Sequence, residues 1–330
     1  MLDIHALPAV LTLVYPPISN QEAIWLREDN ETADQLRKSD FYMIAQRHEA
    51  KFGEWTQTSD YEGLHLIHGS ITSGNLSDTF VLDFRELVST GPYADLLIES
   101  VALEVGPKSL KIFGTTPQGE ILLEWFTTEK LIWERSLERP GMLGLQSVRD
   151  FASYELLYAG MAKDSNTFDR LIDGPHLARQ NILGGQYPMS PGSRVTDEVF
   201  LFAFDIDHFE LRTLDEEDAL TTRTPDEASA RDRAVTADAE KAFITLLRPE
   251  YNGQKYNKYP MGSDGLFSSG LTSYGYVINE NITFTTSSLC LIGATKPIWS
   301  DGHHVHTSGD GADVIVIRGD EVVVVAGTPA

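Results

Sequence analysis

The spacing of apolar and polar residues predicts that the first part of the chain consists mainly of strands. An apolar run at residues 6–15 is interrupted by prolines, and it predicts a buried first strand. Further along, apolar and polar residues alternate in three short runs, and turn residues separate the last two. These runs predict an antiparallel meander at residues 100–105, 109–115 and 120–126.

The middle of the chain has the pattern of a strand followed by helices. Residues 154–159 predict a short strand, and residues 165–172 and 175–183 predict helical segments that are broken at Gly174. An apolar and aromatic run at residues 198–205 predicts a second buried strand.

A long helix with a well-marked start is predicted after this strand. Thr224 is a suitable N-cap, Pro225 suits the first helical position and Glu227 stands where a capping box places its acid. The helix is expected to continue to Leu247, because Pro249 prevents its continuation.

Residues 261–330 are rich in Gly, Ser, Thr and β-branched residues and predict a β-rich extension. It closes with strands at 314–317 and 322–325 around a Gly-Asp turn. At 330 residues the chain is longer than one average domain. We therefore expect an α+β protein of three units: a mixed α/β recognition or partner domain at 1–140, a core at 141–260, and the extension.

Composition adds that the chain is folded and acidic. With 42% hydrophobic residues it can bury a core, but its net charge of −23 argues against nucleic acid, because Lys and Arg supply most non-specific affinity for phosphate. Residues 241–260 are an exception, with four basic residues against Glu250 alone, whereas the acid concentrates at 205–240. A local basic surface is therefore expected.

Cysteine content and hydropathy favour the cytoplasm. Cys290 is the one cysteine, so an intramolecular disulfide cannot form and a reducing compartment is favoured. The first apolar run has no Lys or Arg before it, unlike a secretory signal, and no apolar run approaches the roughly 20 residues needed to span a bilayer. No membrane partner is expected.

Two sequence elements suggest a catalytic site. The first is Leu157-Tyr158-Ala159-Gly160, followed by Arg170 and His176. The second begins at Glu240, within an apolar helical stretch, and ends in the turn Pro249-Glu250-Tyr251-Asn252. Together they resemble the GIY-YIG nuclease superfamily over about residues 154–260. The resemblance implies a small central antiparallel sheet flanked by helices, and hydrolysis of phosphodiester bonds.

The resemblance assigns the phosphate chemistry to a carboxylate and a guanidinium. Glu240 would hold one Mg²⁺ or Mn²⁺, which are hard cations that prefer oxygen ligands. The cation would act as a Lewis acid on the scissile phosphate. Arg170 would offer a planar set of donors to the charge on the phosphoryl oxygens.

Proton transfer and substrate contacts would come from neighbouring residues. Tyr158 or Tyr154, which are four residues apart and are therefore expected on one face of the strand, would help to deprotonate the attacking water. His176 would assist proton transfer or contact phosphate, and Asn252 would orient the site by hydrogen bonds. Expected substrate contacts are Lys163, Arg179 and Lys255.

The first half of the family signature has no clear counterpart. Its best match is Gly144-Leu145-Gln146, with a glutamine where a tyrosine is expected, so the general base stays open. A non-catalytic binding module for nucleic acid or protein, on a nuclease scaffold that has lost its base, is one alternative. A second alternative is a metal site of another hydrolase or an oxygenase, formed by Asp301, His303, His304 and His306.

The leading expectation is a divalent-metal-dependent endonuclease that acts on nucleic acid, with DNA favoured over RNA. Such cores typically serve repair, restriction, mobile elements or defence, and the unusual flanking regions favour restriction or genome defence. A homodimer, or a partner protein bound through residues 1–140, is a further expectation.

Overall fold

The computed structural model describes residues 4–59, 65–89, 92–163, 165–213, 223–262, 264–295, 299–300, 304–305 and 311–327. Its contacts divide the chain into two compact units. The first unit comprises residues 1–47, 153–188 and 194–330, and the second comprises 48–152 and 189–193. These boundaries differ from the three successive units that the sequence pattern predicts. The chain leaves the first unit after Arg47 and returns at Ser153, and a linear pattern carries no sign of such an insertion.

In its described residues, the second unit contains two antiparallel sheets and three helices. One sheet has the order β10-β6-β5-β4 and the other the order β7-β8-β9, so the predicted meander is confirmed. The strands are β4 (Ala50–Ser59), β5 (His65–Ser73), β6 (Leu76–Asp83), β7 (Ser100–Val105), β8 (Ser109–Thr116), β9 (Gly119–Thr127) and β10 (Met142–Gly144). The helices are α3 (Phe84–Ser89), α4 (Thr128–Ser136) and α5 (Val148–Phe151).

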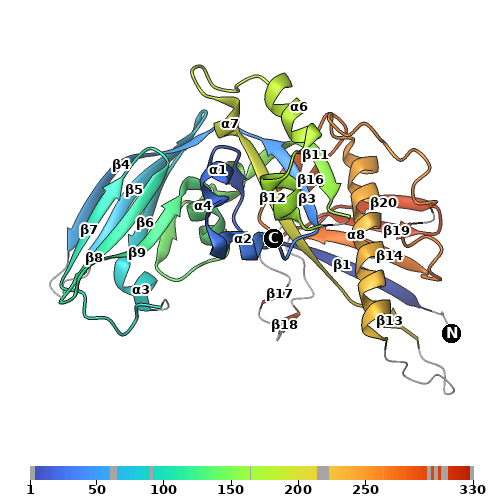
Figure 1. Cartoon of the computed structure of the whole chain (residues 1–330), viewed down its shortest axis with the longest axis horizontal. Helices are drawn as coiled ribbons and strands as arrows, with labels where there is room; N and C mark the ends of the chain where they lie inside the picture. The colour runs from blue at the N-terminus through green and yellow to red at the C-terminus, as the bar shows by residue number, and fades with distance from the viewer. Residues whose placement is uncertain are drawn as a thin grey trace. The chain divides into compact units, whose positions relative to one another are not determined.

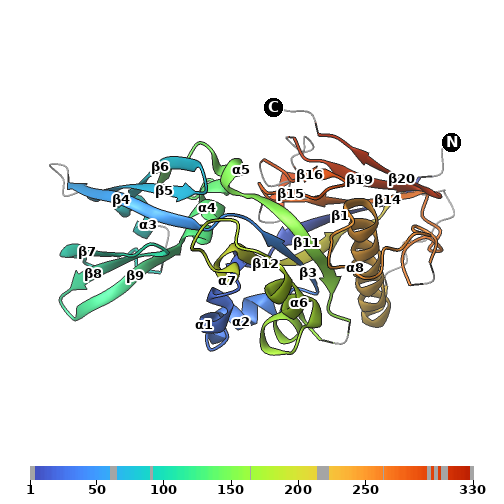
Figure 2. The same ribbon diagram turned by 90° about the horizontal axis from the view of Figure 1, so that it is seen from above.

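The first unit contains one large, curled sheet of 11 strands (Figures 1 and 2). Its main path runs β16-β15-β11-β3-β12-β1-β14-β19-β20, while β13 pairs with β1 and β2 with β12. These strands are β1 (His5–Leu13), β2 (Ile18–Ser19), β3 (Phe41–Gln46), β11 (Ser153–Met161), β12 (Val199–His208), β13 (Leu211–Arg212), β14 (Ser273–Ile278), β15 (Thr283–Thr285), β16 (Cys290–Ile292), β19 (Val314–Arg318) and β20 (Glu321–Val325). The expected α+β class and β-rich C-terminal part are therefore confirmed, and that part extends the same sheet.

Short helices and one long helix accompany this sheet. They are α1 (Glu22–Leu26), α2 (Asn30–Leu36), the π-helix η1 (Phe168–Asp173), α6 (Leu177–Gly185), α7 (Val195–Glu198) and α8 (Pro225–Leu247). Helix α8 begins with the predicted capping box between Thr224 and Glu227. It ends with Arg248 in a left-handed conformation (φ 50°), directly before Pro249. A further strand pair, β17 (Trp299–Ser300) with β18 (His304–Val305), lies outside the large sheet.

The core of the first unit lies where α8 packs on the central strands. All six residues of β3 are buried, as are the first six of β12. On α8, the ring of Phe243 lies 5.6 Å from that of Phe41 and 6.3 Å from that of Tyr276. Burying several such rings stabilises the unit strongly. The packing fixes α8, and hence Glu240, against strand β11. Among the described residues no helix is long and apolar enough to cross a membrane.

Candidate active site

A cavity of about 390 Å³ lies beside the C-terminal half of strand β11. Most of its chemistry comes from segments that are far apart in sequence: β11, η1, α8 and the loop that follows α8. Its lining residues are Tyr158, Met161, Lys163, Ser165, Arg170, Glu240, Ile244, Asn252, Gly253, Gln254 and Tyr256. The structure thus brings together both sequence elements that suggested a catalytic site.

The loop after α8 is attached to the edge of β11 that β3 does not occupy. The backbone N–H of Tyr251 donates to the carbonyl of Leu157 at 3.0 Å. Asn252, only 5% exposed, accepts from the N–H of Ala159 at 3.0 Å and donates to its carbonyl at 2.7 Å. One amide side chain therefore satisfies both backbone groups of a buried residue, as strand pairing would. Asn252 thereby fixes the position of the loop relative to β11.

Glu240 lies further along the same edge. The N–H of Met161 donates to its carboxylate, and the hydroxyl of Tyr256 donates to Oε2 at 3.4 Å. Burial nevertheless raises the pKa of Glu240, against the lowering effects of Lys163, these two hydrogen bonds and Lys241. A carboxylate held in a cavity at the expense of its own solvation is a candidate for binding a cation.

Tyr158 lines the cavity, and a second tyrosine is buried against it. Tyr42 on β3 is fully buried and stacks on Tyr158 of β11, with ring centroids 6.1 Å apart and planes at 20°. In the strand register Tyr42 is opposite Gly160. A Cβ at Gly160 would lie 2.6 Å from the Tyr158 ring and 2.9 Å from the Tyr42 hydroxyl, so the pair requires glycine there. Sequence reasoning found Tyr158 and missed Tyr42.

The hydrogen bonds around the two tyrosines all donate towards Tyr158. The backbone N–H of Arg179 donates to Nδ1 of His176 at 3.0 Å, so the neutral imidazole carries its proton on Nε2. Nε2 lies 2.8 Å from the Tyr42 hydroxyl oxygen and therefore donates to it, as does Nε of Arg170 at 3.1 Å. Tyr42 in turn donates to Tyr158. The chain of donors therefore ends at the Tyr158 hydroxyl, which faces the cavity.

The ionisation states agree with this direction. Burial, with Arg170 and Arg179 nearby, lowers the pKa of His176 to about 4, so the ring is neutral at pH 7. Burial, followed by the charge of Glu240, raises the pKa of Tyr158, whereas the hydrogen bond from Tyr42 and the charge of Arg170 lower it. Tyr158 is thus protonated in the free protein, and added positive charge in the cavity would favour its phenolate.

Tyr154 does not belong to this site. A β-bulge at Leu157 shifts the register between β11 and β3, so Tyr154 and Tyr158 face opposite sides of the sheet despite their spacing of four. Tyr154 is 3% exposed and packs on the rings of Phe200 and Phe202, at 5.4 and 4.9 Å. The expected sharing of one face is wrong, and Tyr154 is a core residue.

Of the three residues expected to contact substrate, only Lys163 lines this cavity. Lys163 is exposed and lines the cavity. Arg179 is turned inward instead, because its guanidinium donates to Asn20 Oδ1 at 2.6 Å and to the carbonyl of Leu171. Lys255 lines a neighbouring cavity and donates to the carbonyl of Pro249.

The remaining candidates lie elsewhere. Gln146, considered for the first half of the family signature, follows β10 in the second unit and is not among the residues that line the cavity. Tyr42 is a second tyrosine beside Tyr158, and its signal in the sequence is the run of five apolar and aromatic residues, Phe41 to Ala45, in β3. The cluster Asp301 to His306 lies outside the described residues, apart from the backbone of β18.

The residues present fit a cation that needs few protein ligands. Among the described residues no group of three or more His, Cys, Asp or Glu side chains could enclose a metal ion. Mg²⁺ does not require one, since it keeps several waters and is often bound through one or two carboxylates plus a substrate phosphate. Glu240 is placed to provide such a carboxylate.

Comparisons with protein-family models, with curated proteins and with solved structures found no match to this chain. The family resemblance therefore depends on the residues and geometry given above.

Proposed function

We propose that the chain is a divalent-metal-dependent endonuclease with a GIY-YIG-like core in its first unit, which hydrolyses phosphodiester bonds in nucleic acid. The convergence of Tyr158, Arg170 and the half-buried Glu240 on one cavity, with Tyr42 buried against Tyr158 and Arg170, carries the proposal. These are the groups that a hydrolase needs to position water, to stabilise phosphoryl charge and to hold a cation.

Glu240 would hold Mg²⁺ or Mn²⁺ together with water and a phosphate oxygen of the substrate. The bound cation would supply Lewis acidity to the scissile phosphate and its leaving oxygen. Lys163 lines the same cavity, and its charge lowers the pKa of Glu240. In this proposal Lys163 would contact the same phosphate group.

Arg170 would bind the non-bridging phosphate oxygens. Its Nε–H donates to the Tyr42 hydroxyl. Within the described part of the chain, the remaining N–H groups of the guanidinium make no hydrogen bond. Tyr42 thus holds the guanidinium in one orientation while leaving its outer fork available for a planar, two-point contact with phosphate.

Tyr158 would orient the attacking water and accept its proton. It is the last member of the hydrogen-bonded chain, and the donation from Tyr42 stabilises negative charge on its oxygen. His176 would act through Tyr42 and not on the substrate, because its two ring nitrogens are already engaged. Tyr42 and His176 are accordingly positioning residues in this proposal.

The presence of Tyr42 weighs against the alternative of a binding module without a base. That alternative arose from Gln146, which lies in the other unit. A binding protein would also have little use for a carboxylate that repels phosphate at the centre of the cavity. Restriction or genome defence, with DNA as substrate, is the biological setting that we propose for this activity.

The test is cleavage of circular double-stranded DNA, single-stranded DNA and RNA in Mg²⁺, Mn²⁺ or EDTA. Wild type should cut at least one substrate only with metal, and Glu240→Gln should cut it more than about 100-fold more slowly. Asp226→Asn, near the start of the same helix, serves as the matched control and should behave as wild type. Metal-independent cutting, or full activity of Glu240→Gln, would overturn the proposal. Nucleic-acid binding without cleavage of any substrate would support the binding module.

A further inference from the structure

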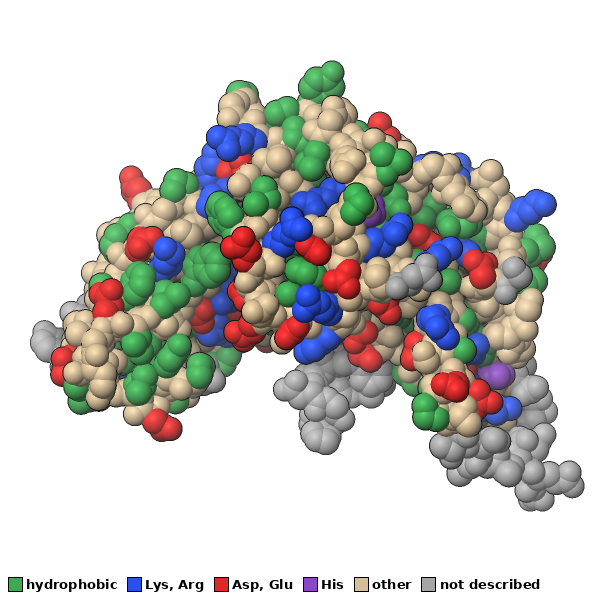
Figure 3. Space-filling view, viewed as in Figure 1, with side chains coloured by type: hydrophobic (Ala, Val, Ile, Leu, Met, Phe, Trp, Pro, Cys, Tyr) green, Lys and Arg blue, Asp and Glu red, His purple; other side chains and the backbone are tan. Residues whose placement is uncertain are grey.

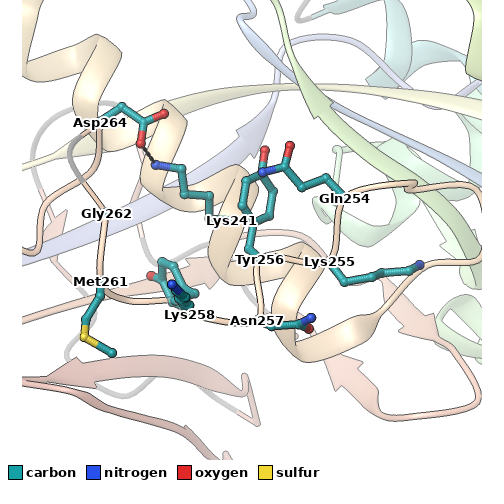
Figure 4. Close-up of a pocket in the computed structure, with 10 residues that line it drawn as sticks. Lys241, Gln254, Lys255, Tyr256, Asn257, Lys258, Met261, Gly262 and Asp264 are labelled. Atoms are coloured by element: carbon teal, nitrogen blue, oxygen red, sulfur yellow. Dashed lines mark hydrogen bonds and ion pairs between the residues drawn. The ribbon is translucent and has the colours of Figure 1, made fainter.

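A second cavity, of about 450 Å³, adjoins the candidate active site. Gln254 and Tyr256 line both cavities, so their walls are continuous. The second cavity is formed by the loop after α8 together with Lys241 on α8 itself (Figure 4). Besides the two shared residues it is lined by Lys241, Lys255, Asn257, Lys258, Tyr259, Met261, Gly262 and Asp264.

Tyr256 separates the two cavities and is held in an unusual conformation. Its φ of 46° lies in the left-handed region, which residues with a side chain rarely adopt. Its carbonyl accepts from the N–H of Tyr259 at 2.8 Å and from Thr245 Oγ1 at 3.4 Å, and its hydroxyl donates to Glu240. Such strain in a wall shared with a catalytic carboxylate is typical of functional sites.

The wall is firmly attached to α8, so the cavity is formed before any ligand binds. The buried carboxylate of Asp238 accepts from the hydroxyls of Tyr259 at 2.6 Å and Tyr276 at 2.9 Å, and from the N–H of Leu266 at 2.8 Å. A Cβ at Gly265 would lie 2.4 Å from the same carboxylate, so the loop passes as close as backbone allows. A preformed pocket loses less entropy on binding.

The lining is basic although the whole chain carries a net charge of −23. It contains three lysines and one aspartate, Asp264, which pairs with Lys241. Lys258 is exposed and makes no ion pair with any described residue. The amides of Gln254 and Asn257 are exposed as well. The cavity thus combines cations, an aromatic ring and groups that both donate and accept hydrogen bonds.

We propose that this second cavity is a subsite for one unpaired nucleotide, next to the phosphodiester cleaved at Glu240. Its base stacks on the ring of Tyr256, its phosphate is bound by Lys258, and the amides of Gln254 and Asn257 contact its base edge. Stacking on an aromatic ring accepts any base, while lysine supplies the charge. The nucleotide must be unpaired, because a base inside a duplex cannot enter a cavity. The proposal rests on the proposed function for the position of this nucleotide.

The first experiment is calorimetric titration with single nucleoside 5′-monophosphates and with inorganic phosphate, in EDTA. Wild type and Glu240→Gln should bind the nucleotides more tightly than phosphate. Tyr256→Ala should weaken nucleotide binding by roughly 10-fold or more, whereas Tyr256→Phe, which keeps the ring and loses the hydrogen bond to Glu240, should stay within about threefold. Lys258→Ala should weaken binding of nucleotides and phosphate alike.

Controls come from residues of the same type outside the cavity. Tyr187→Ala, at a side chain that is 84% exposed, and Lys111→Ala, in the second unit, should leave binding unchanged. Absence of nucleotide binding to wild type would overturn the subsite. The subsite would also be overturned if wild type bound nucleotide no more tightly than phosphate and Tyr256→Ala behaved in the same way. That result would indicate a basic patch only. Circular dichroism establishes that Tyr256→Ala is folded, and Tyr256→Phe keeps the test valid if it is not.

Failure of the subsite and failure of the nuclease give different results. If cleavage depends on Glu240 but nucleotides do not bind, or if Tyr256→Ala cleaves single strands as wild type does, the subsite is wrong and the nuclease stands. If nucleotides bind through Tyr256 but no substrate is cut, the pocket is a nucleotide site on a protein that is not a nuclease. A further test uses a series of single-stranded substrates, each lacking one base at a different position. Cleavage should be slower when the missing base is at one position beside the cut, and unchanged when it is at a distant position.

Discussion

At the scale of a single residue, opposing effects act on the pKa of Glu240. Burial raises its pKa, while the N–H of Met161, the hydroxyl of Tyr256 and the charge of Lys163 lower it. Burial prevails, so the ionised carboxylate is less stable in the folded protein than in water. Such a residue is expected to be kept for function at the expense of stability.

Glu240→Gln should therefore stabilise the protein at neutral pH. The folded-state pKa lies above the ordinary value of 4.5, so the folded state binds more protons and wild-type stability falls as pH rises through that window. The variant should melt roughly 2 °C higher at pH 7 to 8, and the gain should vanish below about pH 4. Thermal unfolding across this pH range measures both. If Glu240→Gln melted below wild type, or if the difference in Tm did not depend on pH, burial would not destabilise the carboxylate.

His176 gives the opposite dependence on pH. Its pKa of about 4 lies below the ordinary 6.5, so protons bind preferentially to the unfolded state. Stability should fall as pH drops from about 6.5 towards 4, by about 3 kcal/mol at most. His176→Gln, whose amide can still donate to Tyr42, should flatten this dependence in urea titrations and retain more activity than His176→Ala. Nuclear magnetic resonance should find the ring of His176 neutral at pH 6, and a protonated ring there would contradict the hydrogen-bond direction given above.

At the scale of elements, strand β11 organises the site through its two edges. On one side it pairs with β3, which brings Tyr42 beneath Tyr158. On the other, from Leu157 onward, side chains and loop backbone replace a neighbouring strand. The edge therefore fixes the glutamate and the loop after α8 in one register relative to the tyrosines.

Asn252→Ala should test how much this edge contributes. The change leaves the N–H and the carbonyl of Ala159 without their partner in a buried position, at a cost of about 2–4 kcal/mol in the free energy of unfolding. Urea titration measures it, with Asn257→Ala as the matched change at an exposed asparagine whose loss should cost little. The cavity should also lose its shape, so kcat should fall in Asn252→Ala. A loss below about 0.5 kcal/mol would mean that water replaces the amide.

Elements with strong local signals were predictable from the sequence. The meander β7 to β9, the capped helix α8 and the final hairpin β19–β20 each show regular periodicity and suitable turn or cap residues. The grouping of Tyr158, Arg170, Glu240 and Asn252 was also anticipated, because their order along the chain matched one motif.

The features of the site that the sequence did not predict depend on pairing between distant segments. Tyr42 precedes Tyr158 by more than a hundred residues, and an entire unit intervenes, so nothing local connects them. The bulge at Leu157 moves Tyr154 to the other face, although a spacing of four predicts a shared face in a regular strand. Sheet order and bulges follow from three-dimensional packing, which single-sequence periodicity does not contain.

At the scale of the whole molecule, charge is unevenly distributed. A cavity of about 340 Å³ in the first unit has four aspartates in its lining, together with Lys38 and His208. The aspartates are Asp40, Asp205, Asp207 and Asp232, and burial with mutual repulsion raises the pKa of Asp40 and Asp205. On the face shown in Figure 3, basic and acidic side chains are interspersed, without a large surface of one sign. The net charge of −23 nevertheless opposes the approach of a polyanion to the protein as a whole, so attraction is expected at the lysine-lined cavities.

This distribution predicts a small salt dependence of nucleic-acid binding. Lys163, Arg170, Lys255 and Lys258 line the two adjoining cavities, so about four phosphates can be neutralised. For a single strand the slope of log affinity against log salt should be about −3. Fluorescence anisotropy of Glu240→Gln with a short labelled oligonucleotide in EDTA measures the slope without cleavage.

Adding Lys258→Ala should reduce the magnitude of this slope by roughly 0.7, because one fewer counterion is released. Lys111→Ala, which removes the same charge from strand β8 of the second unit, should leave the slope unchanged. If both changes reduced it equally, attraction would come from the net charge of the protein and not from these cavities. A slope steeper than about −6 would require a further basic surface, beyond the residues that line the two cavities.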